Sequence, residues 1–454
     1  MSKTRLPQTI TLVGLLALSL HTAFASEITL DEAIQHALQH SPVLQGSKAG
    51  MQSADEQYKT VRAGRLPRID VSYDALYSDN PLASLASKLN TRSVTAEDFQ
   101  PGNINNPASF DTYKAGLSVE VPLYTGGRLT AETDEAAATS ESAELRHDRT
   151  RSTIVYEVSR AYLYAQAAKQ AKVIARSGAQ AAKRHVATTS KLLNEGRTVT
   201  ADKLTAEVYF TSVSSAVQKA DSQYKQALNA LKQVTGMDLA ADLDVNDWNS
   251  NIQLDTLPDV DEAEQIAITN RADLKASLAS IRAAKARTRK AKSSSLPQFS
   301  VVGMGDLYGS DPLTDEGSWA VLARARMNLY SGGANKTRIS AARYDRIRLE
   351  SERADQLATI RREVRDAYAA REEGEQRLKL ANSNLKTARE AVRQVNERYG
   401  EGRTILIDLL QSEQALLNSR TEWLNASLRQ KEGGLTIRHA MDSLAATTRP
   451  GDAS

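Results

Sequence analysis

Two aspartates that follow matching turn sequences are the residues best placed for chemistry. The motif Glu-Gly-Arg-Thr begins at Glu195 and again at Glu401, and four residues after its threonine come Asp202 and Asp408. The glycine of each motif can adopt the positive φ that ends a helix. Each aspartate then lies near the start of the next helix, where the helix dipole stabilises a carboxylate by about 0.3–1 kcal/mol. The pattern predicts two helical hairpins with matching tips.

Other residues that could support catalysis or bind a metal are sparse. His36 and His40 lie four residues apart on one predicted helix, but no third ligand accompanies them. Gly303 and Gly305 are not followed by a helix with a basic residue, so they form no phosphate loop. The chain has no cysteine and only 6 methionines, which gives no support for thiolate chemistry, disulfides or a dedicated copper exporter. We predict neither an enzyme nor a bound cofactor or metal.

The N-terminus predicts export from the cytoplasm. Residues 1–25 combine a basic start, a short apolar run from Ile10 to Leu20 and a small-x-small cleavage site that ends at Ala25. Such a segment is typical of a secretory signal peptide, and its apolar run is too short for a membrane helix. Its removal takes the formal charge from +3 to +1, because the segment holds two basic residues and no acid. We therefore predict no nucleic-acid partner.

Internal matches indicate a tandem duplication. Asp31-Glu32-Ala33 recurs 230 residues later, and Tyr124-Thr125-Gly126-Gly127 recurs 206 residues later with serine in place of threonine. The two hairpin tips also lie 206 residues apart, so the first repeat holds 24 extra residues before Tyr124. The predicted division is a first repeat over 26–238, an equatorial linking segment over 239–258, a second repeat over 259–445 and a disordered tail over 446–454.

Four segments alternate between apolar and polar residues with a period of two. They are residues 66–78, 112–124, 297–308 and 318–330, and each is close to the length of about 9–11 residues that crosses a bilayer as a tilted strand. In the first segment Ile69, Val71 and Tyr73 alternate with charged or polar residues, so one face of the predicted sheet is apolar. A half-buried sheet of a soluble protein would alternate in the same way.

A membrane position for these strands requires more than one chain. Four strands cannot close a barrel, and an open edge in lipid leaves backbone groups unpaired at a cost of several kcal/mol each. Two chains would give eight strands and a barrel filled by its own side chains, whereas three would give twelve strands and a lumen. The segments between strands, residues 78–112 and 309–318, are predicted to be loops outside the membrane.

Long helices account for most of the remaining chain. Residues 128–195 and 334–400 contain no proline, and about 68 residues at 1.5 Å each predict a helix of about 100 Å. Shorter helices are predicted over 31–65, over 199–236 and over 404–430. The first two of these, stacked end to end, would lie beside one long helix. Leu409, Leu416 and Trp423 repeat every seven residues, which predicts a coiled-coil seam.

Together these motifs resemble the TolC family of outer-membrane efflux and secretion proteins. The resemblance rests on Leu30-Asp31-Glu32-Ala33-Ile34 with Ala37-Leu38 and Ser41-Pro42, on Leu66-Pro67, on Tyr124-Thr125-Gly126-Gly127 with its repeat, and on Gly402 followed by Asp408-Leu409-Leu410. It implies an α+β membrane protein in which three chains share one twelve-stranded outer-membrane β-barrel. Each chain would contribute four strands, and a long periplasmic α-helical barrel would continue the channel.

The resemblance also implies a function and partners. It implies a passive export duct from the periplasm to the exterior of a Gram-negative bacterium, in tripartite efflux or in type I secretion. A periplasmic adaptor (membrane fusion) protein and an inner-membrane pump or ABC transporter would bind the homotrimer, and outer-membrane lipid would surround the barrel. The alternative is a secreted or periplasmic structural coiled-coil protein, which would be a soluble monomer.

Roles for the tip residues follow from the same resemblance. Asp408 matches the first acid of a ring that narrows the periplasmic entrance, whereas the position of the second acid holds Gln411. This departure puts a double acidic ring in question. Contact with the adaptor is implied for four tip residues, Glu195, Gly196, Glu401 and Gly402.

A second implied role concerns closure of the entrance. Asp202 matches an aspartate that links the tips and holds the entrance shut in the family. Its basic partner would fall at Thr404, so Arg403 or Arg197 would have to take that part here.

Overall fold

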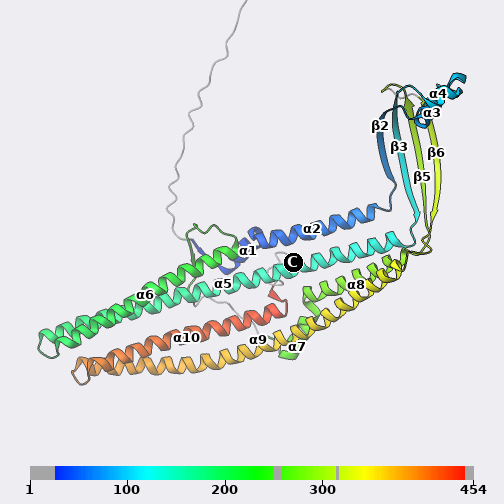
Figure 1. Ribbon diagram of the computed structural model, residues 1–454. Coiled ribbons are helices and arrows are strands. Elements are labelled where there is room, and N and C mark those ends of the chain that lie inside the picture. Colours follow the sequence, from blue (N-terminus) through cyan, green and yellow to red (C-terminus); the bar gives the residue numbers. More distant parts are fainter. Residues whose placement is uncertain (1–25, 249–256, 313–315, 445–454) are drawn as a thin grey trace, which may run out of the picture.

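The chain forms an elongated molecule with a β-sheet at one end and two helical hairpins that turn at the other end (Figure 1). The computed structural model describes residues 26–248, 257–312 and 316–444. The predicted signal peptide over 1–25 and the predicted tail over 446–454 lie outside these residues. Among the residues described, no helix is both long enough and apolar enough to cross a bilayer.

Four antiparallel strands form the sheet, in the order β2-β3-β5-β6. They are β2 (Arg68–Ser78), β3 (Phe110–Tyr124), β5 (Gln298–Gly309) and β6 (Glu316–Arg326). The register places Ile69 opposite Val119 on one face and aligns Ser72, Gly116 and Asp306 in a row on the other. The predicted separation into an apolar and a polar face is confirmed.

The two outer strands of the sheet each keep one open edge. In the described part of the chain β2 pairs only with β3, and β6 pairs only with β5. Apolar residues of both strands, such as Val71 and Trp319, are strongly exposed in the single chain. The prediction that the last strand reaches residue 330 is wrong, because β5 begins at Gln298, and its partner there is Arg326.

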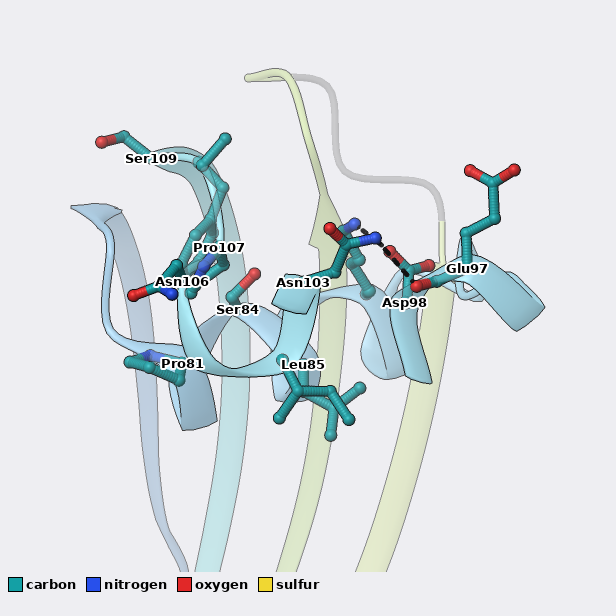
Figure 2. A pocket seen from close by; sticks show the side chains of 13 residues that line it. Pro81, Ser84, Leu85, Glu97, Asp98, Asn103, Asn106, Pro107 and Ser109 are labelled. Atoms are coloured by element: carbon teal, nitrogen blue, oxygen red, sulfur yellow. Dashed lines mark hydrogen bonds and ion pairs between the residues drawn. The ribbon is translucent and has the colours of Figure 1, made fainter. Parts of the chain in front are cut away.

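The segment between β2 and β3 is folded rather than a plain loop. It contains α3 (Pro81–Asn90), a 3-10 helix η1 (Ala96–Phe99) and α4 (Pro101–Asn105). These elements enclose a cavity of about 390 Å³, into which Pro81, Asp98 and Asn103 face (Figure 2). Arg92 pairs with Glu316 of β6 at 3.1 Å, so the segment is tied to the far edge of the sheet. Its structure was missed because short helices carry little periodic signal.

Two helices of 67 residues each run from the sheet to the tips. They are α5 (Arg128–Asn194) and α9 (Ala334–Gly400). Both begin at a glycine with positive φ, Gly127 at 79° and Gly333 at 87°, directly after the strand-to-helix turn. The positions and lengths agree with the predicted long helices. The seam predicted for the helix after the second tip agrees as well, since Leu409 and Leu416 are buried.

The shorter helices meet end to end beside the long ones, at places we call the first and second joints. At the first joint, α1 (Leu30–His40) and α2 (Pro42–Ala63) meet the end of α6 (Thr200–Thr235). A single helix over 31–65 is therefore a wrong prediction. Ser41 adopts an extended conformation because the residue before a proline is excluded from the helical region, and the chain bends there.

The second joint lies where α7 (Val260–Asn270) and α8 (Ala272–Ser293) meet the end of α10 (Leu406–Ala440). No proline marks this break, which falls at Arg271. The helix α10 extends ten residues beyond the predicted end at 430. It remains helical through Gly433, where α10 lies so close to α9 that an added Cβ would be 3.2 Å from the Arg371 Cα.

A small parallel sheet forms beside the first joint. β1 (Ser26–Ile28) pairs with β4 (Leu243–Val245), and the Tyr162 hydroxyl of α5 donates to the Ile28 carbonyl at 2.9 Å. Trp248 is buried in the same core. The linking segment over 239–258 was predicted to be irregular, which is wrong for β4; residues 249–256 lie outside the described part.

Candidate functional site

The candidate site is the pair of hairpin tips farthest from the sheet. The first hairpin (α5 and α6, residues 128–235) and the second hairpin (α9 and α10, residues 334–440) turn side by side (Figure 1). Along the layer the helices follow the order α6, α5, α10, α9, because α10 packs on both long helices and α6 packs chiefly on α5.

Both tips end their long helix with the same hydrogen-bond motif. Gly196 has φ 68° and Gly402 has φ 72°. In the first tip the Arg197 amide donates to the Leu192 carbonyl at 2.8 Å and the Gly196 amide to Leu193 at 3.0 Å, and the second tip repeats this pattern. These bonds satisfy the last carbonyls of the helix, which defines a Schellman motif. The prediction that the tip glycines cap helices is confirmed.

The charged side chains of the tips are exposed and pair locally. Arg197 lies 3.5 Å from Glu195, and Arg403 forms an ion pair with Glu401. Arg197 also reaches across to the other hairpin, since its Nη2 would lie 3.5 Å from a Cβ placed on Gly402. The two tips are therefore in contact through a solvated arginine.

The two aspartates bind threonines of their own tip. The Thr198 hydroxyl donates to Asp202, and the Thr404 hydroxyl donates to Asp408 at 2.7 Å. Thr404, where the family resemblance would place a basic partner, instead bonds Asp408 of its own tip. Asp408 is exposed on α10, and Gln411 is exposed one turn further along. Within the single chain neither arginine is bonded to either aspartate.

An apolar cluster beneath the tips holds the four helices together. Its members come from every helix of the two hairpins: Leu192, Ala206, Tyr399, Leu406, Leu409 and Leu410. Behind this cluster lies a buried polar pair, in which His185 Nε2 of α5 is 2.9 Å from Glu413 Oε1 of α10. Burial, and then the charge of Glu413, raise the pKa of Tyr209 on α6 to about 12.

The sequence interpretation missed this pair, although a signal existed. In the heptad seam that places Leu410 and Leu417 at equivalent positions, Glu413 occupies a position that an apolar residue usually takes. A charged residue in such a seam must find a buried partner. His185 is 228 positions away in the sequence, so the partner itself could not be identified.

Comparison with known proteins decides the family. The family model "Outer membrane efflux protein" matches residues 33–237 and 264–441. The chain belongs to this family. Outer membrane protein OprJ of Pseudomonas aeruginosa is 24% identical over 84% of this chain and 77% of its own. Proteases secretion protein PrtF of Dickeya chrysanthemi is 21% identical over 94% and 91%. The solved structure of CusC matches 93% of this chain and 95% of its own with a TM-score of 0.78 at 19% identity.

Membership in the outer membrane efflux family, which is the TolC family, confirms the predicted family, function and location. The protein is an export channel component of the Gram-negative outer membrane that extends into the periplasm. A structural coiled-coil protein, the alternative from the sequence, is set aside. The fold of long helices that continue a small sheet is the fold of the solved relatives.

His36 and His40 of this efflux family protein bind backbone carbonyls rather than a common ligand. His36 Nδ1 is 3.1 Å from the Thr235 carbonyl, and His40 Nδ1 is 3.1 Å from the His36 carbonyl. The two rings stack at 4.3 Å. In the described ranges, no three His, Cys, Asp or Glu residues are grouped as a metal site would require.

Proposed function

We propose that three copies of this chain form one export channel, closed at its periplasmic end by the six hairpin tips. The open edges of β2 and β6, each 11 residues long, are the observation that carries this proposal. In lipid such edges leave backbone groups unpaired, so β6 of one copy must pair with β2 of the next. Three copies of a four-stranded sheet give twelve strands, which is wide enough for a lumen.

The helical layer supports the same ring. Its lateral helices are α6 and α9, and both expose large apolar side chains that single-chain packing leaves uncovered. On α6 Leu204 is 56% and Val208 is 71% exposed, and on α9 Leu380 is 66% exposed. Around a three-fold axis α6 of one copy lies beside α9 of the next, which covers these side chains.

A tandem duplication is part of the proposal. The first hairpin and the second have long helices of equal length, equal caps and an offset of 206 between their tip residues. With two such units per chain, a ring of three chains contains six similar hairpins. The wall of the tunnel is then built from nearly equivalent units.

The aperture is proposed to be a single ring of carboxylates. Asp408 is exposed at the start of α10, and the neutral Gln411 follows one turn on. Three copies thus bring three acids together instead of six. Asp202 lies on α6, which α5 separates from α10. Such a ring attracts cations at the mouth. The exposed tip residues around Gly196 and Gly402 would contact a periplasmic adaptor, and an inner-membrane pump or ABC transporter would supply the energy for export.

The trimer is tested with cysteines, since the chain has none of its own. Cysteine in β2 combined with cysteine in β6 can form a disulfide only between copies, because β3 and β5 separate these strands within one chain. We expect a cross-linked trimer in outer-membrane fractions, and a heat-sensitive trimer band without cross-linking. A monomer that stays in the soluble fraction would overturn the proposal.

The aperture is tested by the block of single-channel current in planar bilayers by divalent cations. Asp408→Asn should weaken the block because it removes the ring of charge, whereas Asp202→Asn on α6 serves as the matched control and should change it less. An unchanged block in Asp408→Asn would remove this residue from the aperture.

A further inference from the structure

A buried polar layer borders the tip cluster on the side away from the tips and shares Tyr399 with it. It consists of His185 and Thr189 on α5, Tyr399 on α9 and Glu413 on α10. His185 is 7% exposed and Glu413 is 8% exposed, and Nε2 lies 2.9 Å from Oε1. Thr189 Oγ1 lies 2.9 Å from the Tyr399 hydroxyl. The layer therefore bonds the first hairpin to both helices of the second.

The contacts on both sides of this layer are apolar. On the tip side they are a cluster of leucines, and on the other side a glycine of α5 lies against a leucine of α10. Toward the tip, Leu192 packs with Leu409 and Leu410. Away from the tip, α5 and α10 pack closely at Gly178, where an added Cβ would lie 2.7 Å from Leu417 Cδ2. Gly178, His185 and Leu192 are spaced by seven residues, so all three lie on one face of α5.

The charged and titratable groups around the pair come from the neighbouring helices. Tyr209 of α6 faces Glu413, whose charge adds to the effect of burial on this tyrosine. On α10, burial and then Arg389 lower the pKa of Arg420, which Glu413 opposes, and Arg420 Nη1 donates to Ser177 Oγ of α5 at 2.8 Å. His185 and Glu413 are thus each other's partner at a largely buried place between α5 and α10.

We propose that the His185–Glu413 pair is a latch that positions the second hairpin against the first, and thereby sets the width of the aperture. The proposal rests on the proposed channel function, and makes both side chains positioning residues for Asp408. Nine residues of α10, about 14 Å of helix, separate Leu417 from Asp408. A change in the tilt of α10 about the Gly178–Leu417 contact therefore moves the carboxylate at the mouth.

The hairpins are held together by the free-energy cost of leaving one member of a buried polar pair without its partner. With both partners present, the interface is satisfied and the hairpins stay together. When one partner is removed, the other is left buried without a hydrogen bond, which is strongly unfavourable. Separation of the hairpin ends admits water to that group and relieves the penalty. Replacement of both partners by apolar residues removes the penalty without separation.

The equivalent position of the first hairpin supplies a matched control. Glu207 lies 206 residues before Glu413, but it is only half-buried and pairs with Lys203 at 3.7 Å on the same helix. Ala391, which corresponds to His185, is exposed. The latch is therefore a feature of the α5–α10 contact alone.

The test compares Glu413→Leu, His185→Leu and the double variant with Glu207→Leu, all in the full-length protein. Single-channel conductance in planar bilayers and heat dissociation of the trimer are measured for each. We expect a several-fold larger conductance step in both single variants, a near wild-type step in the double variant and in Glu207→Leu, and trimers in every case. Glu413→Gln, which keeps the size of the side chain, should give an intermediate step and replaces Glu413→Leu if the latter fails to assemble.

Three results would overturn the latch. Single variants with wild-type steps and lower heat stability would make the pair a structural contact only. A double variant that conducts as much as the singles would show that the two residues do not act on each other. A wild-type protein without any conductance would instead refute the proposed channel, and the latch with it.

Discussion

The two joints of the chain occupy equivalent places in the fold but are built from different interactions. At the first joint the contacts are neutral: His36 lies 3.1 Å from the Thr235 carbonyl, and Gly236 fits against the His40 carbonyl. At the second joint they are ionic. Arg271 pairs with Asp273 at 2.7 Å and with Glu363 at 2.6 Å, and Asp442 accepts from the Ala272 amide at 3.0 Å.

This difference shows two ways to interrupt a helix at the same place. The first joint uses the backbone, because a proline forces the residue before it to be extended. The second has no proline, and side-chain ion pairs accompany the non-helical backbone of Arg271 (φ −55°, ψ 118°) instead. The first joint should therefore tolerate side-chain changes, whereas the second should depend on its charges and on pH.

The largest difference is expected for Arg271→Ala against Ser41→Ala. Arg271 is 5% exposed, and its loss leaves Asp273 and Glu363 without their partner. The two carboxylates left behind are 25% and 42% exposed, so the loss should lie below the roughly 3–5 kcal/mol of a fully buried pair and still reach about 1–3 kcal/mol. Ser41 makes no capping bond with its side chain, so its loss should cost less than about 1 kcal/mol. Denaturant titration of the purified protein measures both, and equal losses would contradict the comparison.

The second-largest difference is expected in the loss of folding stability at low pH. Burial, followed by nearby Arg149, lowers the pKa of His439 at the second joint to about 4 from its usual 6.5. Between these values the unfolded chain binds the proton and the folded chain does not, so stability is complete above pH 6.5 and falls as the pH drops toward 4. The loss amounts to about 3 kcal/mol at most.

His439→Gln should reduce this acid-dependent loss, because glutamine does not titrate. His40→Gln at the first joint is the matched control, since its imidazole is exposed and bonded to a backbone carbonyl. The free energy of unfolding at pH 7 and pH 5 measures the difference. If His439→Gln loses as much stability in acid as the wild type, the buried imidazole is not the cause.

The smallest effect separates the first joint from the tips. Gly236 has φ 76°, and a Cβ there would lie 2.8 Å from the His40 carbonyl oxygen, so Gly236→Ala adds a backbone clash to conformational strain. Gly196 has φ 68° with open space around it, and Gly196→Ala should cost only the strain of about 1–2 kcal/mol. Thermal unfolding should rank Gly236→Ala as the less stable variant. The reverse order would mean that the first joint is loosely packed.

The sequence predicted the parts of the fold whose signals are local. Alternation placed the four strands, and the tip glycines placed the hairpin ends with their caps. Both signals depend on residues that are close together in the sequence, so they can be detected in a single sequence. The prediction of a single helix over 31–65 overlooked a local signal. Pro42 directly follows Ser41 and marks the break between two helices.

The features that were missed depend on partners far apart in the sequence. The break at Arg271 needs Glu363, 92 residues away, and the pair of His185 with Glu413 spans 228 residues. The strand β4 is three residues long and exists because β1 lies beside it. No periodicity within either segment carries that information, because the stabilising group comes from another helix or strand.

The unbroken length of α5 and α9 has a mechanical consequence. Each runs unbroken past the place where two shorter helices meet, so beside a joint only the long helix continues from the sheet to the tips. Bending stiffness is therefore lowest at the level of the joints. A sideways load on the tips is converted into flexure at that level, while the sheet and the hairpins move as rigid segments.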